Sequence, residues 1–78
     1  MGMIKYIQCK FQKDNTFTTA WIEDYGAKVG NRVTFEEEPT EWWNVIEVYD
    51  SIKMTKEDVL DRARDHVHFK KTTSIAKN

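Results

Sequence analysis

WWNVIEVY, at positions 42–49, is the stretch that decides the fold. Period-2 alternation places apolar side chains on both of its faces: Trp43, Val45 and Tyr49 on one, and Trp42, Ile46 and Val48 on the other. A strand that is apolar on both faces is typical of a central position covered from both sides. Because they are adjacent, Trp42 and Trp43 must point to opposite faces, so only one of them can enter the main core.

Three further strands are expected upstream, over residues 4–12, 16–23 and 32–36. Asp14 and Asn15, between the first two, tolerate the left-handed conformation of a tight hairpin turn. Gly30 and Asn31 supply positive φ at low cost and predict a second turn before the third strand. Together with residues 42–49, these segments predict a strongly curved four-stranded antiparallel sheet.

A helix is expected after the last strand, over residues 56–67. Thr55 is a favourable N-cap, and Asp58 lies three residues later in the capping-box position. One apolar stripe follows, made by Val59, Leu60, Ala63 and Val67. The fold class is therefore α+β, with one small domain at 1–69, one C-terminal helix packed on the sheet, and a flexible basic tail at 70–78.

The composition describes a small folded chain rather than a membrane or disordered one. Its 78 residues hold 12 Lys+Arg against 13 Asp+Glu, with three Trp, three Tyr and four Phe. Apolar runs are too short to span a bilayer, and no signal-peptide pattern is present. One Cys cannot form an internal disulfide, which agrees with a reducing cytoplasm. We expect a cytoplasmic protein without membrane contact.

Residues capable of chemistry are few. Cys9 alternates onto the same face as Ile7 and Phe11, where a thiol behaves as a small hydrophobic group. No phosphate-binding glycine loop or nucleophile elbow is present. We therefore expect no enzymatic activity and no cofactor.

A metal site would have to come from the helix end. Asp61, Asp65 and His68 are spaced i, i+4 and i+7, but His68 lies where the helix is expected to end, and His66 would point elsewhere. A charged helix terminus explains these residues without a metal, and none is expected.

Charge is segregated along the chain. Residues 1–22 have a net charge of +2, residues 23–50 of −6 and residues 51–78 of +3. The acidic middle also holds five of the ten aromatic residues, among them Trp42 and Trp43. Exposed Trp beside carboxylates suits a surface that captures a basic protein segment by stacking, cation–π contact and charge steering. The candidate partner-binding residues are Trp21, Tyr25, Glu36, Glu37, Glu38, Glu41, Trp42 and Trp43.

The predicted function is thus a non-enzymatic protein-binding module, whose partner is another protein or a second copy in a homodimer. The competing explanation for the aromatics is structural, with the second Trp covered by the helix. An alternative function is nucleic-acid binding by the basic C-terminal segment through Arg62, Arg64, Lys70 and Lys71. A third is an inhibitor that mimics nucleic acid through the glutamates of residues 36–41.

Two segments carry a family resemblance. KVGNRVTF at 28–35, followed by EWWNVIEV at 41–48, resembles the strand rhythm of small SH3-like barrels. The whole stretch 5–50 also resembles short uncharacterised open reading frames of bacteriophages. The resemblance implies a sheet that closes as a small barrel, and an accessory protein that binds a host or phage partner. Asn31 stands where such barrels commonly have Asp, and a helix follows where an SH3 domain has its closing strand.

Overall fold

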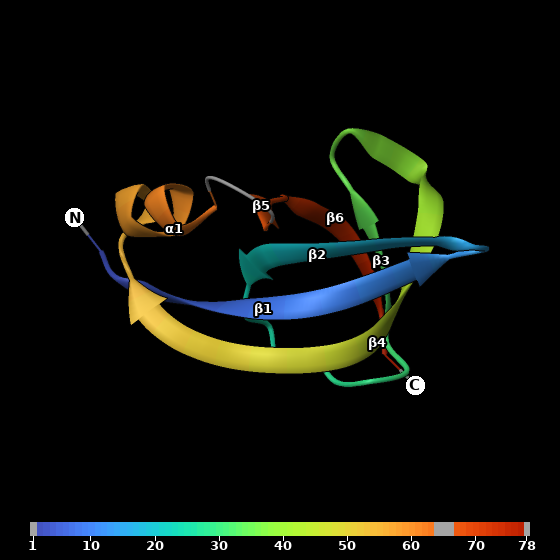
Figure 1. Cartoon of the computed structure of the whole chain (residues 1–78), viewed down its shortest axis with the longest axis horizontal. Coiled ribbons are helices and arrows are strands. Elements are labelled where there is room, and N and C mark those ends of the chain that lie inside the picture. Colours follow the sequence, from blue (N-terminus) through green and yellow to red (C-terminus); the bar gives the residue numbers. More distant parts are fainter. Residues whose placement is uncertain (1, 64–66, 78) are drawn as a thin grey trace.

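The computed structural model describes residues 2–63 and 67–77, which form a six-stranded sheet and one short helix (Figure 1). The elements in chain order are β1 (Ile4–Lys13), β2 (Thr16–Glu23), β3 (Arg32–Phe35), β4 (Glu38–Met54), α1 (Lys56–Arg62), β5 (His68–Phe69) and β6 (Thr72–Ala76). Their order across the sheet is β5-β2-β1-β4-β3-β6. Adjacent strands are antiparallel except β2 and β5, which are parallel.

The strand-rich α+β content agrees with the expectation, but the four-stranded antiparallel count is wrong. The segment expected to be a flexible tail, residues 70–78, contains β6, which pairs with β3. With β5 and β6 at opposite edges the sheet is open, and it does not reproduce the SH3-like barrel. The last predicted strand, 42–49, is only the middle of the much longer β4.

Local turn chemistry determines the two connections that the sequence identified. Asp14 has a φ of 54°, and Lys13 faces Thr16 across the resulting two-residue hairpin. Gly30 has a φ of 98°, which side chains rarely tolerate. Beside it the Asn31 side chain accepts a 3.0 Å hydrogen bond from the Lys28 N–H, which fixes the turn into β3.

The helix begins as predicted and ends earlier. The Thr55 hydroxyl accepts a 3.2 Å hydrogen bond from the Asp58 N–H, which is the N-cap interaction. Helical structure ends at Arg62, with Ala63 as the C-cap, rather than at residue 67. Positions 64–66 lie outside the described residues. Of the predicted stripe, Val59 is fully buried whereas Leu60 is exposed.

Where it pairs with β1, β4 contains two bulges that the sequence pattern did not reveal. Opposite β1, the pairing shifts between Lys10 and Phe11 and again between Ile7 and Cys9. The first shift leaves Ile46 as an extra residue in β4, and the second leaves residues 49–50 opposite a single residue of β1. Bulges bend a strand and increase its twist. β4 accordingly forms a long arc alongside β1, and α1 follows at its end (Figure 1).

Two clusters of buried side chains lie on opposite faces of the sheet. The main core, on the face of Cys9 and Phe11, consists of Ile7, Cys9, Phe11, Ala20, Ile22, Ala27, Val33, Phe35, Trp43 and Val45. The helix cluster consists of Tyr6, Trp21, Met54 and Val59, with Ile52, Ala63, Val67 and Phe69 packed against it. Because α1 is short, it covers only the end of its face where β4 stops, and within residues 2–63 and 67–77 the side chains of Phe17 and Trp42 elsewhere on that face are exposed.

Candidate binding surface

Two of the three tryptophans predicted for the partner surface are core residues. Trp21 is 4% exposed in the helix cluster, and Trp43 is 6% exposed in the main core, whereas Trp42 is 41% exposed. The structure thus confirms that Trp42 and Trp43 point to opposite faces. Trp21 and Trp43 cannot contact a partner without unfolding, because each fills the thin core of a small chain.

Tyr25 is half-buried against the main core and does not join Trp42 on a common surface. Lys77 Nζ lies 5.4 Å from the centroid of its ring and donates to its backbone carbonyl. Burial raises the pKa of Tyr25 to about 12, and the nearby Cys9 and Asp24 add to the shift. Tyr25 therefore stays protonated at neutral pH, with its ring held against the main core.

The predicted acidic surface is largely neutralised by the chain's own lysines. Lys13 Nζ lies 3.6 Å from a Glu38 carboxylate oxygen and 3.5 Å from one of Glu41. Lys70 pairs with Glu37, and Lys71 lies 3.7 Å from Glu36. We call residues 36–41, which contain these four glutamates, the acidic turn. Three lysines lie beside its four glutamates, so the net charge of this group is only −1. Neither steering of a basic partner nor nucleic-acid mimicry is favoured by so small a field.

The alternative nucleic-acid set is not brought together either. Lys70 and Lys71 face the acidic turn, where a small hollow of about 200 Å³ is lined by these two lysines, Glu36, Glu37 and Phe69. Arg62 lines a different cleft, beneath α1. Arg64 lies outside the described residues. Among the described residues, Lys70 and Lys71 therefore pair with glutamates of the turn between β3 and β4, and Arg62 lies apart from them.

The surface that sequence reasoning missed is the open part of the sheet face not covered by α1. We call it the aromatic face. Strand register defines it: Gln12 faces both Phe17 and Asn44, and Asn44 faces Arg32, so these side chains form one row across β2, β1, β4 and β3. Lys10 and Glu47 form the neighbouring row. The aromatic face comprises Lys10, Gln12, Phe17, Arg32, Trp42, Asn44, Glu47 and Tyr49.

Three aromatic rings on this face are exposed, and two of them have a cation alongside. Phe17 is 54% exposed and Tyr49 is 44% exposed. Lys10 Nζ lies 5.2 Å from the Phe17 centroid, and Arg32 Cζ lies 5.3 Å from the Trp42 centroid. Exposed cation–π pairs contribute only about 0.5–1 kcal/mol each, so they orient these side chains more than they stabilise the fold.

Tyr49 reaches this face because of the bulges in β4. Strict alternation would put it with Trp43, but its hydroxyl donates to the carboxylate of Glu47, which lies on the aromatic face opposite Lys10. This hydrogen bond raises the pKa of Tyr49, and desolvation and the Glu47 charge add to it. Val48, predicted to share a face with Trp42, packs instead against the main core. The sequence shows the aromatic residues themselves, but it does not show the bulges in β4 that bring Tyr49 to the same face as Trp42.

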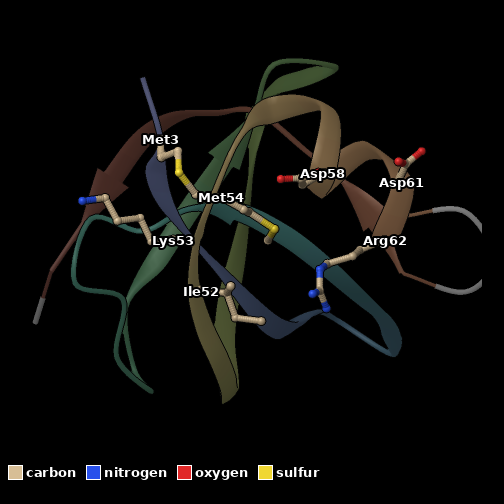
Figure 2. A pocket seen from close by; sticks show the side chains of 7 residues that line it. All are labelled: Met3, Ile52, Lys53, Met54, Asp58, Asp61 and Arg62. Carbon is tan, nitrogen blue, oxygen red and sulfur yellow. The ribbon is translucent and has the colours of Figure 1, made fainter. Parts of the chain in front are cut away.

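A cleft of about 500 Å³ lies beneath α1. It is lined by Met3, Ile52, Lys53, Met54, Asp58, Asp61 and Arg62 (Figure 2). Figure 2 shows the Asp58 carboxylate turned toward Met54 and the Asp61 carboxylate turned away from it. Charges of both signs and mostly exposed side chains give this cleft no preference for one ligand class.

The buried thiol has no arrangement for nucleophilic chemistry. Cys9 is fully buried in the main core, and burial raises its pKa to about 12, with a further contribution from Asp24. A thiol with that pKa remains protonated and unreactive at neutral pH. Within residues 2–63 and 67–77, no group of three His, Cys, Asp or Glu side chains is placed to hold a metal ion. Of the residues weighed for a metal site, His68 is an exposed residue of β5, and 65 and 66 fall in the undescribed segment.

In the same described part of the chain, no helix has the length and apolar character needed to cross a membrane. Comparison with known proteins identifies no matching family model, no matching curated protein and no matching solved structure.

Proposed function

We propose that this chain is a non-enzymatic accessory protein that binds an extended segment of another macromolecule through the aromatic face. One observation supports this proposal above all: Phe17, Trp42 and Tyr49 are all more than 40% exposed on one uncovered sheet face. Small cores need their aromatic residues, so large rings left in solvent on one face usually mark a contact surface.

The proposal keeps the predicted non-enzymatic binding role, widens the partner from a protein to a macromolecule, and changes the location of the site. In place of Trp21, Trp43 and the acidic turn, the contact surface consists of side chains from four strands. Those strands are held from behind by the main core, where Phe11 and Phe35 pack edge to face with centroids 5.1 Å apart. A rigid support of this kind lowers the entropy cost of binding, because the rings are already positioned.

Site-specific photo-cross-linking tests the location. A benzophenone amino acid replaces Gln12, at the middle of the aromatic face, and in a matched protein it replaces the exposed Leu60 of α1. Irradiation in the cells that produce the protein should give adducts from position 12 and few from position 60. Combining the position-12 probe with F17S and W42S should abolish them. Equal adducts from both positions, or adducts that survive the two substitutions, would refute the proposal.

A further inference from the structure

We infer that the segment bound by the aromatic face is single-stranded nucleic acid, with bases stacked on Phe17 and Trp42 and phosphates held by Lys10 and Arg32. This inference rests on the function proposed above and names its ligand. Protein segments and a second copy of the chain are the competing occupants, and the test below separates them.

The spacing of the rings is the first argument. Phe17 lies on β2 and Trp42 on β4, the two strands that flank β1. At ordinary strand spacing the axes of β2 and β4 are therefore about 9.5 Å apart across the sheet. Between them lie the polar side chains of Gln12 and Asn44. The core of a protein–protein interface is a contiguous apolar patch. Isolated rings with polar groups between them suit a chain of bases, each of which stacks separately while the sugar-phosphate backbone crosses the intervals.

The charges on the face are the second argument. Each of two rings has its own cation, with Lys10 Nζ over Phe17 and Arg32 Cζ over Trp42. When a base stacks on such a ring, the cation can move from the ring face to the adjacent phosphate, and the guanidinium can bind that phosphate through two hydrogen bonds. The carboxylate on this face, Glu47, accepts a hydrogen bond from Tyr49. The net charge of the aromatic face is therefore +1, in a chain whose total is −1.

The glutamates of residues 36–41 would by themselves repel a phosphate backbone. This repulsion is weakened because Lys13, Lys70 and Lys71 pair with them. Because Lys70 and Lys71 are engaged in these ion pairs, we place the nucleic-acid contact on the aromatic face and not on the basic C-terminal segment.

Amide side chains complete the surface. Gln12 Nε2 donates a 2.9 Å hydrogen bond to the Asp14 carbonyl, which fixes the orientation of its amide. Asn44 is exposed beside it in the same row. Amides offer both donors and acceptors to base edges, whose patterns differ from base to base. We expect modest base preference on top of stacking that is largely independent of sequence.

Fluorescence anisotropy of labelled ten-nucleotide oligo(dT) and oligo(U), titrated with the full chain, tests the inference. Affinity should fall with salt, with a log–log slope of about −1.4 or shallower, because two phosphate contacts are expected. F17A and W42A should each weaken binding about fivefold or more, and K10Q with R32Q should flatten the slope. Leu60→Ala and Lys56→Gln are matched controls on α1 and should leave the affinity unchanged.

Three outcomes would overturn the inference: no anisotropy change at about 20 mM salt with either oligonucleotide, equal binding of a duplex of the same length, or full affinity in W42A and F17A. The adducts from position 12 then separate this inference from the proposed function. Nuclease-sensitive adducts support both. Adducts that resist nuclease and disappear with protease support a binding face but refute nucleic acid as its ligand. Absence of adducts refutes both.

Discussion

The hydrogen bond between the hydroxyls of Thr34 and Thr73 links β3 to β6 and gives a sharp test of the fold. If residues 70–78 were a flexible tail, substitutions at these two positions would have independent effects on the free energy of unfolding. Thr34 Oγ1 and Thr73 Oγ1 lie 2.8 Å apart and share one hydrogen bond. Thr34 is 1% exposed, whereas Thr73 is exposed to solvent. The two substitutions Thr34→Val and Thr73→Val should therefore have unequal effects.

The magnitudes follow from what each substitution leaves behind. Thr73→Val strands the buried Thr34 hydroxyl and should cost about 1–3 kcal/mol of unfolding free energy, which is roughly 4–8 °C in Tm per kcal/mol for a chain of this size. Thr34→Val leaves the Thr73 hydroxyl to water and should cost less than about 1 kcal/mol. In the Thr34→Val background, Thr73→Val should then be nearly neutral, so the coupling energy is at least about 1 kcal/mol.

Urea unfolding of the four proteins, followed by tryptophan fluorescence, measures this coupling. Ser74→Ala, an exposed change on the same strand, is the control and should stay within about 0.5 kcal/mol of wild type. If Thr73→Val has the same small effect in both backgrounds, β6 does not pair with β3 and our account of the sheet edge is wrong.

Three further predictions concern the interior and the loop at Asp24. Cys9, whose thiol pKa burial raises to about 12, should resist a disulfide reagent at pH 8 and react fully in denaturant; rapid reaction of the folded protein would contradict its burial. Partial burial acts to raise the pKa of Asp24, but hydrogen bonds, first among them that from Ser51, outweigh it and lower the pKa. The ionised carboxylate therefore stabilises the fold above about pH 4, and this contribution disappears as the pH falls below that value. The urea midpoint of Asp24→Asn, measured between pH 3 and 6, should lack the loss of stability that Asp24 causes in the wild type. If the two proteins show the same pH profile, Asp24 does not contribute to the pH dependence of stability. Val59→Ala should lower the unfolding free energy by about 1.5–2.5 kcal/mol, because two buried methyl groups are lost and a cavity forms, whereas Leu60→Ala should change it by less than about 0.5 kcal/mol in the same chemical melts.

Features set by neighbouring residues could be predicted from the sequence. The hairpin at Asp14 and the N-cap at Thr55 each depend on one side chain and the backbone within three residues of it. Both the predicted second strand and the observed β2 cover residues 16–23. Local chemistry of this kind does not depend on which distant strand pairs with which.

Features set by distant pairing could not be predicted. Thr72–Ala76 has few apolar side chains, and its strand conformation comes from backbone pairing with β3 rather than from a periodic pattern. The extra residue Ile46 likewise has no mark in the sequence, yet it moves Val48 into the main core. Alternation showed that either Trp42 or Trp43 is exposed, but the choice depends on the register of β4 against β3, where Val33 faces Trp43.

The arrangement of the two edge strands has a consequence for how the protein is made. β5 and β6 are separated in the chain only by Lys70 and Lys71, yet they occupy opposite edges of the sheet. During translation the N-terminal strands emerge first, and β2 and β3 have no edge partner until residues 68–76 leave the ribosome. Unpaired strand edges are templates for aggregation. In one late event β6 therefore covers all four residues of β3 and β5 covers two of the eight residues of β2, so a ribosome that stalls before residue 68 would release a chain with both of these edges unpaired.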